Sequence, residues 1–174
     1  MESRKICVRA ETPGDRSAVH DVLARAFPSD AEVRLVEALR GRTEPQVSLV
    51  AEDPSLGVIG HILFTPVEIR GRAESSRAMA LGPMAVLPER QRKSAGSALV
   101  EAGLSACAAV GELVVVVLGH PDYYPRFGFR PGWDFGLYYR APGPNPAFMV
   151  CELAHGALRG RTGEVVYHAA FGSL

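Results

Sequence analysis

The sequence predicts a mixed α/β domain of the α+β type, in which a twisted, mostly antiparallel sheet of about seven strands carries helices on both faces. Two observations support this prediction. Runs rich in β-branched residues alternate with segments of helical spacing. The apolar run Leu113–Leu118 is uninterrupted, as expected of a strand that is covered on both faces. The 174 residues suffice for one core, so we expect residues 1–174 to form a single domain.

The first third of the chain predicts one strand, two helices and a hairpin. Residues 4–10 alternate like a strand, and apolar residues at helical spacing follow Asp15 and Asp30, which stand where N-caps are expected. Two β-rich runs, residues 46–52 and 58–69, are joined by a D-P-S-L-G turn. The two helices could cover a substrate groove. Four charged residues of the second helix are expected to face outward: Glu32, Arg34, Glu37 and Arg40.

The remaining elements predict a strand, a helix and further strands. A strand ends at Val86, a helix follows it, and the apolar run Leu113–Leu118 comes next. Such a strand, helix and strand favour a parallel crossover. A short helix from Pro121 to Gly128 is expected to carry two tyrosines. Three later strands are expected at residues 135–139, 147–153 and 164–168.

Composition argues against several classes of function. The 19 Lys and Arg residues balance 19 Asp and Glu, so no net charge favours nucleic acid or an anionic membrane as partner. Cys7, Cys107 and Cys151 are odd in number and widely spaced, without a C-x-x-C pattern or clustered histidines. This argues against a metal site and a disulfide framework, and indicates a reducing, cytoplasmic setting. The sequence also has no signal-peptide core and no apolar run near the roughly 20 residues that span a bilayer.

The stretch Leu81–Ala98, which we call the cradle, carries the strongest functional signal. An apolar strand runs there through a loop of basic and small residues into the start of a helix. Free N–H groups and the positive end of the helix dipole converge at such a point, so a phosphate can bind. The stretch has neither the G-x-x-x-x-G-K-[ST] pattern of triphosphate sites nor the G-x-G-x-x-G pattern of dinucleotide sites. We therefore predict a pyrophosphate site of another kind.

The motif V-x-P-x-x-Q-x-x-S-x-G, from Val86 to Gly96, resembles the acyl-coenzyme A motif of the GNAT N-acetyltransferases. A second stretch, Y-Y-P-R-F-G-F, resembles that family's Y-x-x-x-G-F pattern, and Tyr124 falls on the family's tyrosine. The combination L-G-H-P-x-Y-Y-x-R-F-G-F is similar to a branch of bacterial predicted N-acetyltransferases. The order of elements also matches, so the resemblance covers essentially the whole chain as one acyl-CoA N-acyltransferase-like domain.

One position departs from the family pattern, because Ser94 stands where the family has the first glycine of its loop. If that glycine provides a positive φ or a close approach to phosphate, serine would weaken coenzyme binding by ~1–2 kcal/mol. A serine with helical dihedrals would instead keep its N–H and add a hydroxyl donor. The sequence leaves both alternatives open.

The resemblance implies transfer of an acetyl group from acetyl-CoA, the co-substrate, directly to a primary amine. Tyr124 would protonate the leaving thiolate, and the amine would be deprotonated by His61, His120 or Asp122. The implied coenzyme-binding residues are Met84, Ala85, Val86, Gln91, Arg92, Lys93, Ser94, Ala95, Gly96, Ser97 and Ala98.

Several of these residues also fit structural roles. His61 fits a core histidine, Arg126 fits either a turn anchor or a coenzyme contact, and Cys107 fits core packing. The basic run after Gln91 also fits a solvated surface.

Two further functions fit the sequence. A longer acyl group, carried by coenzyme A or an acyl carrier protein, would need a wider pocket, for which Phe148 and residues 165–174 are candidates. A non-catalytic acyl-CoA binding or sensing domain is motivated by Ser94 and by the unassigned base. For the acceptor, an acidic pocket would favour polyamines or aminoglycosides, and an open groove would favour a protein terminus or lysine. A homodimer is compatible with all of these.

Overall fold

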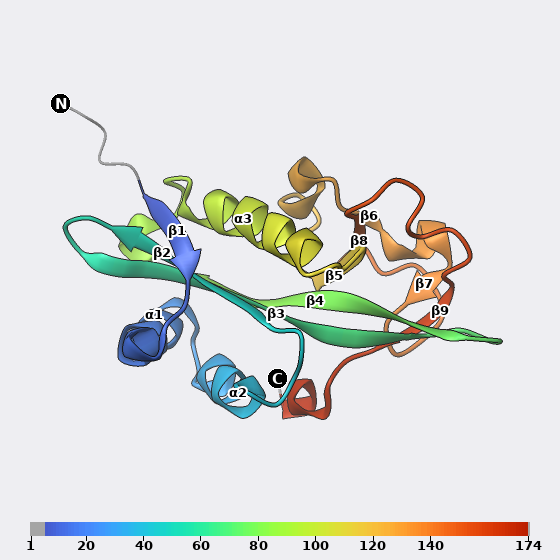
Figure 1. Ribbon diagram of the computed structural model, residues 1–174, viewed down its shortest axis with the longest axis horizontal. Coiled ribbons are helices and arrows are strands. Elements are labelled where there is room, and N and C mark those ends of the chain that lie inside the picture. Colours follow the sequence, from blue (N-terminus) through green and yellow to red (C-terminus); the bar gives the residue numbers. More distant parts are fainter. Residues whose placement is uncertain (1–5, 174) are drawn as a thin grey trace.

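The computed structural model describes residues 6–173, which form one mixed sheet with helices on both faces. In Figure 1, α3 lies on one side of the sheet, whereas α1, α2 and the C-terminal turn lie on the other. The described residues form nine strands, two of them only two residues long, against the expected seven or so. The predicted fold class is confirmed.

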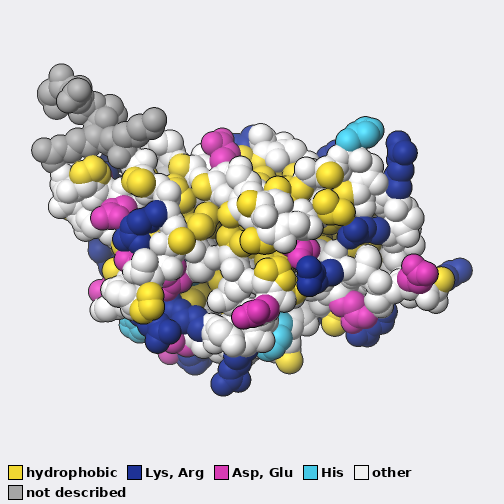
Figure 2. All heavy atoms as spheres, in the orientation of Figure 1, with side chains coloured by type: hydrophobic (Ala, Val, Ile, Leu, Met, Phe, Trp, Pro, Cys, Tyr) yellow, Lys and Arg dark blue, Asp and Glu magenta, His cyan; other side chains and the backbone are white. Residues whose placement is uncertain are grey.

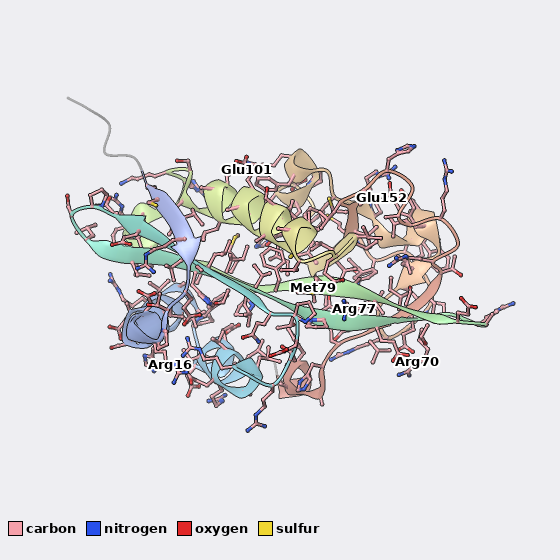
Figure 3. All side chains as sticks on the ribbon, in the orientation of Figure 1. Arg16, Arg70, Arg77, Met79, Glu101 and Glu152 are labelled. Carbon is pink, nitrogen blue, oxygen red and sulfur yellow. The ribbon has the colours of Figure 1, made fainter. Side chains whose placement is uncertain are left out.

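The first four strands form an antiparallel sheet in chain order. They are β1 (Cys7–Ala10), β2 (Val47–Asp53), β3 (Gly57–Arg70) and β4 (Ser75–Val86). The predicted hairpin is therefore confirmed. Residues 4 and 5 of the first expected strand lie outside the described residues. The long hairpin of β3 and β4 projects beyond the rest of the sheet, with Arg70 near its end (Figure 3).

Two helices, α1 (Arg16–Ala26) and α2 (Ala31–Leu39), connect β1 to β2. They form because apolar residues recur at helical spacing, and Val19, Leu23 and Val36 are fully buried against the sheet. Asp15 and Asp30 stand at the N-cap positions, but neither side chain makes a capping hydrogen bond. Instead, the carboxylate of Asp15 binds Arg9 and Thr12, and that of Asp30 binds Arg34.

The parallel crossover in the middle of the sheet is confirmed, and it determines where the site lies. After β4, α3 (Ala95–Ala109) crosses one face and leads to β5 (Val114–Leu118). The strand β5 pairs in parallel with β4 only along Met79–Leu81, so the two strands then diverge. From Gly82 to Val86, β4 keeps β3 on one edge and has no strand of residues 6–173 on the other.

The last third of the chain consists of short elements. They are the 3-10 turns η3 (Tyr124–Phe127), η4 (Gly132–Phe135) and η5 (Ala169–Ser173), and the strands β6 (Arg130–Pro131), β7 (Leu137–Tyr138), β8 (Phe148–Glu152) and β9 (Gly163–Val166). The helix expected between Pro121 and Gly128 is thus only the single turn η3. The strand β9 returns to pair with the far end of β3, and η5 then packs on α2.

The packing of α3 on the sheet depends on a glycine. A Cβ atom on Gly103 would lie 2.2 Å from Cε2 of the fully buried Phe64. The helix axis can therefore approach the sheet closely at this point. Figure 3 shows the resulting layers, with Glu101 on the outer side of α3, Arg16 on the outer side of α1 and Met79 between them.

The surface carries both hydrophobic and charged side chains (Figure 2). Hydrophobic side chains gather over the α3 side of the view in Figure 2, while charged side chains are spread around it. Among residues 6–173, no helix combines the length and apolarity needed to cross a membrane. All three cysteines carry free thiols. Burial raises the pKa of Cys107 to about 12, so its thiol stays protonated and serves packing.

Candidate functional site

The divergence of β4 and β5 opens a cleft of about 840 Å³. Its lining comes from α3 and η3 and from α2 and η5. Because α3 and α2 lie on opposite faces of the sheet (Figure 1), the cleft reaches both faces. Met84 and Val86 of β4 lie in its wall between these ends. A ligand could therefore enter from one face and meet a second ligand that enters from the opposite face.

The start of α3 offers hydrogen-bond donors to this cleft. The first helical bond runs from the N–H of Ala98 to the carbonyl of Ser94, at 2.9 Å. The N–H groups of the three residues between them, Ala95, Gly96 and Ser97, have no acceptor within the helix. Gly96 keeps the approach open, since a Cβ atom there would lie 3.0 Å from the hydroxyl oxygen of Tyr123. The chain thus presents the N-terminus of a helix to the cleft, the kind of position at which anions bind in other proteins.

Gln91, Arg92 and Lys93, which precede α3, have different roles. The side-chain amide of Gln91 donates to the carbonyl of Val86 at 3.1 Å, and so ties the loop to the end of β4. Arg92 lines the cleft. Lys93 is not among the lining residues, because its ammonium group donates to the carbonyl of Glu89 at 3.1 Å.

Ser94 has φ +67° and ψ −8°, in the left-handed region. Of the two alternatives left open by the sequence, the helical serine is wrong and the positive φ is present. Its hydroxyl donates to the carbonyl of Lys93 at 2.6 Å. The residue lines the cleft while holding a conformation that favours glycine.

We expect Ser94→Gly to raise the free energy of unfolding by about 0.5–1 kcal/mol, because relief of left-handed strain exceeds the extra entropy of unfolded glycine. Chemical denaturation measures this directly. Ser105→Gly, at an exposed position inside α3, is the matched control and should lower stability by about 0.5 kcal/mol. Equal destabilisation by both substitutions would contradict the prediction.

Tyr124 lies where β5 ends and η3 begins, and it is 7% exposed. Its ring meets the rings of Tyr123 and Phe129 edge to face, at centroid distances of 5.1 and 5.6 Å. Gly119 makes room for it, since a Cβ there would lie 2.3 Å from Cε2 of Tyr124. Burial, and to a lesser degree Tyr123, raises the pKa of Tyr124 to about 12. The phenol is therefore a protonated donor at neutral pH.

Two other residues of this turn line the cleft, His120 and Arg126. The carbonyl of His120 accepts a hydrogen bond from the N–H of Tyr123 at 3.0 Å, which fixes the turn on the end of β5. Arg126 donates from Nε to the carbonyl of Tyr123 at 2.9 Å and stacks over that tyrosine's ring at 4.7 Å. Arg126 thus anchors the turn and also borders the cleft.

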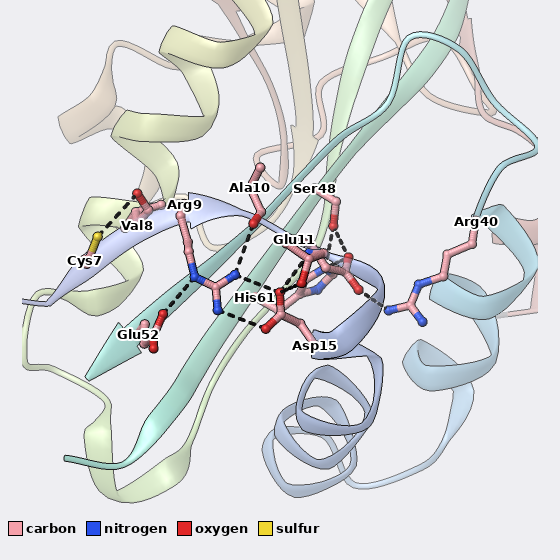
Figure 4. A network of polar contacts seen from close by, with 11 residues as sticks. Cys7, Val8, Arg9, Ala10, Glu11, Asp15, Arg40, Ser48, Glu52 and His61 are labelled. Carbon is pink, nitrogen blue, oxygen red and sulfur yellow. Dashed lines mark hydrogen bonds and ion pairs between the residues drawn. The ribbon is translucent and has the colours of Figure 1, made fainter. Parts of the chain in front are cut away.

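His61 lies in a different place, inside a buried network shown in Figure 4. Its Nε2 is 2.9 Å from the hydroxyl of Ser48 and 3.3 Å from Oε2 of Glu11. Arg40, the residue directly after α2, binds the other oxygen of Glu11 at 2.5 Å. Burial alone would raise the pKa of Glu11, but hydrogen bonds from His61 and Ser48 and the nearby cations lower it. This network joins α2 to the sheet.

Several other residues predicted from the sequence for the site lie outside the cleft lining. Asp122 is exposed and does not line the cleft, and neither do the side chains of Ala85, Ala95 and Ala98. Phe148, a candidate for a wider pocket, packs in a second core, where a Cβ on Gly132 would lie 2.6 Å from its ring. Within residues 6–173, no group of three His, Cys, Asp or Glu residues is arranged to hold a metal ion.

The end of the cleft near α2, which we call the acceptor end, is formed by five residues. They are Phe27, Glu32, Leu35, Tyr167 and Phe171. The C-terminal segment 165–174 was expected to contribute to a pocket, and two of its residues do; Leu174 lies outside the described residues. Glu32 was expected to face outward but is half-buried in the cleft. Helical periodicity could not reveal this, because η5, from the distant end of the chain, packs beside α2.

Comparisons with known proteins agree with this geometry. A family model described as an acetyltransferase (GNAT) domain matches residues 7–132. The chain is 38% identical over 164 residues to the uncharacterized N-acetyltransferase YhbS of Escherichia coli K12, covering 94% of this chain and 97% of that protein. It is 39% identical over 135 residues to YjhQ of the same strain, covering 76% and 73% of the two chains.

Two solved structures resemble the whole chain. The crystal structure of E. coli YhbS in complex with CoA has a TM-score of 0.89 and 36% identity, covering 99% of this chain and 94% of that one. A GNAT family acetyltransferase from Brucella melitensis in complex with acetyl-CoA has a TM-score of 0.76 and 32% identity, covering 97% and 99%. The similarity therefore extends across both faces of the cleft.

Proposed function

We infer that this chain, which belongs to the GNAT acetyltransferase family and is therefore an acyltransferase, transfers an acetyl group from acetyl-CoA to a primary amine. One observation carries this proposal. The protonated phenol of Tyr124 and the free N–H groups at the start of α3 border the same cleft, beside the unpaired edge of β4. The same cleft thus contains an acid that could protonate the thiolate of coenzyme A and donors that could bind its phosphates.

The donor end of the cleft fits a coenzyme A thioester. The N–H groups of Ala95, Gly96 and Ser97 would bind the pyrophosphate, and Arg92 would add positive charge. The free edge of β4 from Gly82 to Val86 would pair with the amide groups of the pantetheine, as an added strand does. The two similar structures with CoA and acetyl-CoA support this choice of donor.

Tyr124 would act as the general acid. The amine nitrogen forms a bond to the thioester carbonyl carbon, and the carbon–sulfur bond then breaks. Tyr124 gives its proton to the departing sulfur, and the amine loses a proton to a base. Backbone donors along the β4 edge would stabilise the oxyanion between these steps. A buried phenol suits this role because it stays protonated near neutral pH.

Among the candidate bases, we propose His120. It lines the cleft beside Tyr124, whereas His61 is enclosed by Ser48 and Glu11, and Asp122 lies on the outer surface. An imidazole is also the side chain that most readily takes a proton near neutral pH. The longer acyl donor stays an alternative, because Phe148 packs in the second core whereas Tyr167 and Phe171 of the segment 165–174 line the cleft.

Calorimetric titration with acetyl-CoA tests the donor assignment, and we expect micromolar binding by the wild type. Gly96→Val should weaken this binding at least tenfold, since the added carbons would fill the space between Tyr123 and Met84. Ser105→Val, on the exposed face of the same helix, is the control and should bind within twofold of wild type. A wild type that binds neither acetyl-CoA nor CoA would refute the proposal.

A further inference from the structure

Two buried polar atoms at the acceptor end are left without partners by the protein. One is the carboxylate oxygen Oε2 of Glu32, on α2, and the other is the hydroxyl oxygen of Tyr167, which follows β9. Neither is in contact with solvent, and neither forms a hydrogen bond with any of residues 6–173. Both residues line the cleft. Buried polar atoms are nearly always paired, and the residues that carry these two line the cleft, so a side-chain rotation toward a bound ligand would give both atoms a partner.

The charges along the cleft indicate what that ligand is. Arg92 and Arg126 border the donor end, where the phosphates would bind. Among the lining residues, all of which are described, Glu32 is the one carboxylate, and it lies at the opposite end. The cleft therefore has a basic end for an anion and an acidic end for a cation. An amine is a cation at neutral pH, so Glu32 matches the second substrate and not the first.

The rest of the acceptor end is apolar. Phe27, Leu35 and Phe171 line the cleft together with Glu32, and the rings of Tyr167 and Phe171 meet edge to face with their centroids 5.1 Å apart. Aromatic faces also favour a nearby cation. Polyamines and aminoglycosides carry several positive charges, and their other cations would be buried here without partners. A single carboxylate in an apolar chamber fits one ammonium group on an apolar body.

We propose that the acceptor is a primary amine with a single positive charge on an apolar alkyl or aromatic body, and that Glu32 binds its ammonium group as it enters the cleft. The same nitrogen is the nucleophile, so it leaves Glu32 when it passes one proton through His120 to water and becomes the neutral amine that attacks. Its second proton is lost to His120 after the carbon–nitrogen bond has formed. The identification rests on the proposed acetyl transfer, since it names the second substrate of that reaction. Glu32 acts as the specificity determinant. Tyr167 offers the same ligand a second polar contact, and burial raises the pKa of Tyr167, so its hydroxyl stays protonated.

The kinetic test follows thiol release from acetyl-CoA with three acceptors, 2-phenylethylamine, spermidine and a lysine-containing peptide. We expect kcat/KM to be at least tenfold higher for 2-phenylethylamine than for the other two. Glu32→Gln should raise the KM for 2-phenylethylamine at least tenfold, because it removes the charge but keeps the shape. The Kd of the Glu32→Gln variant for acetyl-CoA should stay within twofold of the wild-type value. Hexylamine tests whether the aromatic ring matters beyond its apolar surface. Its kcat/KM should also exceed that of spermidine.

The control is Glu37→Gln, the same change on the same helix. The carboxylate of Glu37 lies outside the cleft, where Arg40 donates to it at 2.7 Å. This variant should keep the wild-type KM for the amine. A binding readout is independent of turnover: calorimetry of 2-phenylethylamine on protein saturated with CoA should show affinity at least tenfold weaker in Glu32→Gln.

Different results would refute the acceptor assignment and the proposed acetyl transfer. Three results would overturn the acceptor assignment: a preference for spermidine or the peptide, no turnover of any amine, or an unchanged KM in Glu32→Gln. In each case the binding of acetyl-CoA would still support the donor site. Absent binding of acetyl-CoA by the wild type would overturn the proposed function instead. In that case, 2-phenylethylamine would be titrated into the coenzyme-free wild type and the coenzyme-free Glu32→Gln variant. Weaker binding by the variant would support the acceptor site independently of the coenzyme, and equal binding would refute it.

Discussion

Tyr124→Phe is expected to lower kcat by roughly 10²–10³-fold while the Kd for acetyl-CoA changes less than twofold. The substitution removes only the hydroxyl, so the edge-to-face contacts of the ring with Tyr123 and Phe129 are kept. The thiolate would then leave without a positioned proton donor. Thiol release under saturating substrates measures kcat, and calorimetry measures the Kd.

The pH dependence of this reaction gives a second check on the same residue. Because burial raises the pKa of Tyr124 to about 12, the acid is protonated below that pH and is lost only above it. Tyr124 should therefore cause no decline of kcat between pH 7 and 10. Tyr138→Phe, on the short strand β7, removes a hydroxyl outside the cleft and serves as control. An unchanged kcat in Tyr124→Phe would rule out the acid role.

Gly103→Ala is expected to lower the free energy of unfolding by about 2 kcal/mol, although alanine is the better helix former. Helix propensity alone favours alanine by about 1 kcal/mol. The new methyl would, however, lie 2.2 and 2.4 Å from two ring carbons of Phe64, which is fully buried and cannot move aside. Overpacking costs about 1–3 kcal/mol, and contacts as short as these belong at the upper end of that range, so a net loss of about 2 kcal/mol remains after the gain in propensity.

Urea denaturation of Gly103→Ala and of Ser105→Ala separates the two effects. Ser105 is exposed on the same helix, so its replacement reports propensity alone and should stabilise by about 0.5 kcal/mol. The two substitutions should thus have opposite signs. Stabilisation by Gly103→Ala would mean that α3 is free to lift from the sheet.

The elements and the donor end could be predicted from the sequence because their signals are local. Alternation and helical spacing act within a few residues, and the segment from Val86 to Gly96 places a strand end beside a helix start. The dihedral angles of Ser94 could not be predicted, since serine is compatible with both conformations. The motif likewise named Tyr124, but only the packing against Gly119 explains how that ring is held.

The acceptor end could not be predicted because it depends on contacts between distant parts of the chain. Glu32 occupies a position that periodicity assigns to solvent, and it is covered only because η5 packs on α2. His61 was a candidate base because histidine can titrate near neutral pH. Strand register instead pairs it with Val50 of β2 and brings it to Glu11 and Ser48. Neither outcome leaves a signal within a short window of sequence.

The position of the C-terminal turn also gives the cleft an order of assembly. The donor end and Tyr124 come from the chain between β4 and η3, whereas Tyr167 and Phe171 follow β9. A ribosome delivers Glu32 on α2 first, then the segment that would hold the coenzyme, and the C-terminal turn that covers the acceptor end only afterwards. The acceptor end of the cleft is thus completed only when η5 joins Phe27, Glu32 and Leu35.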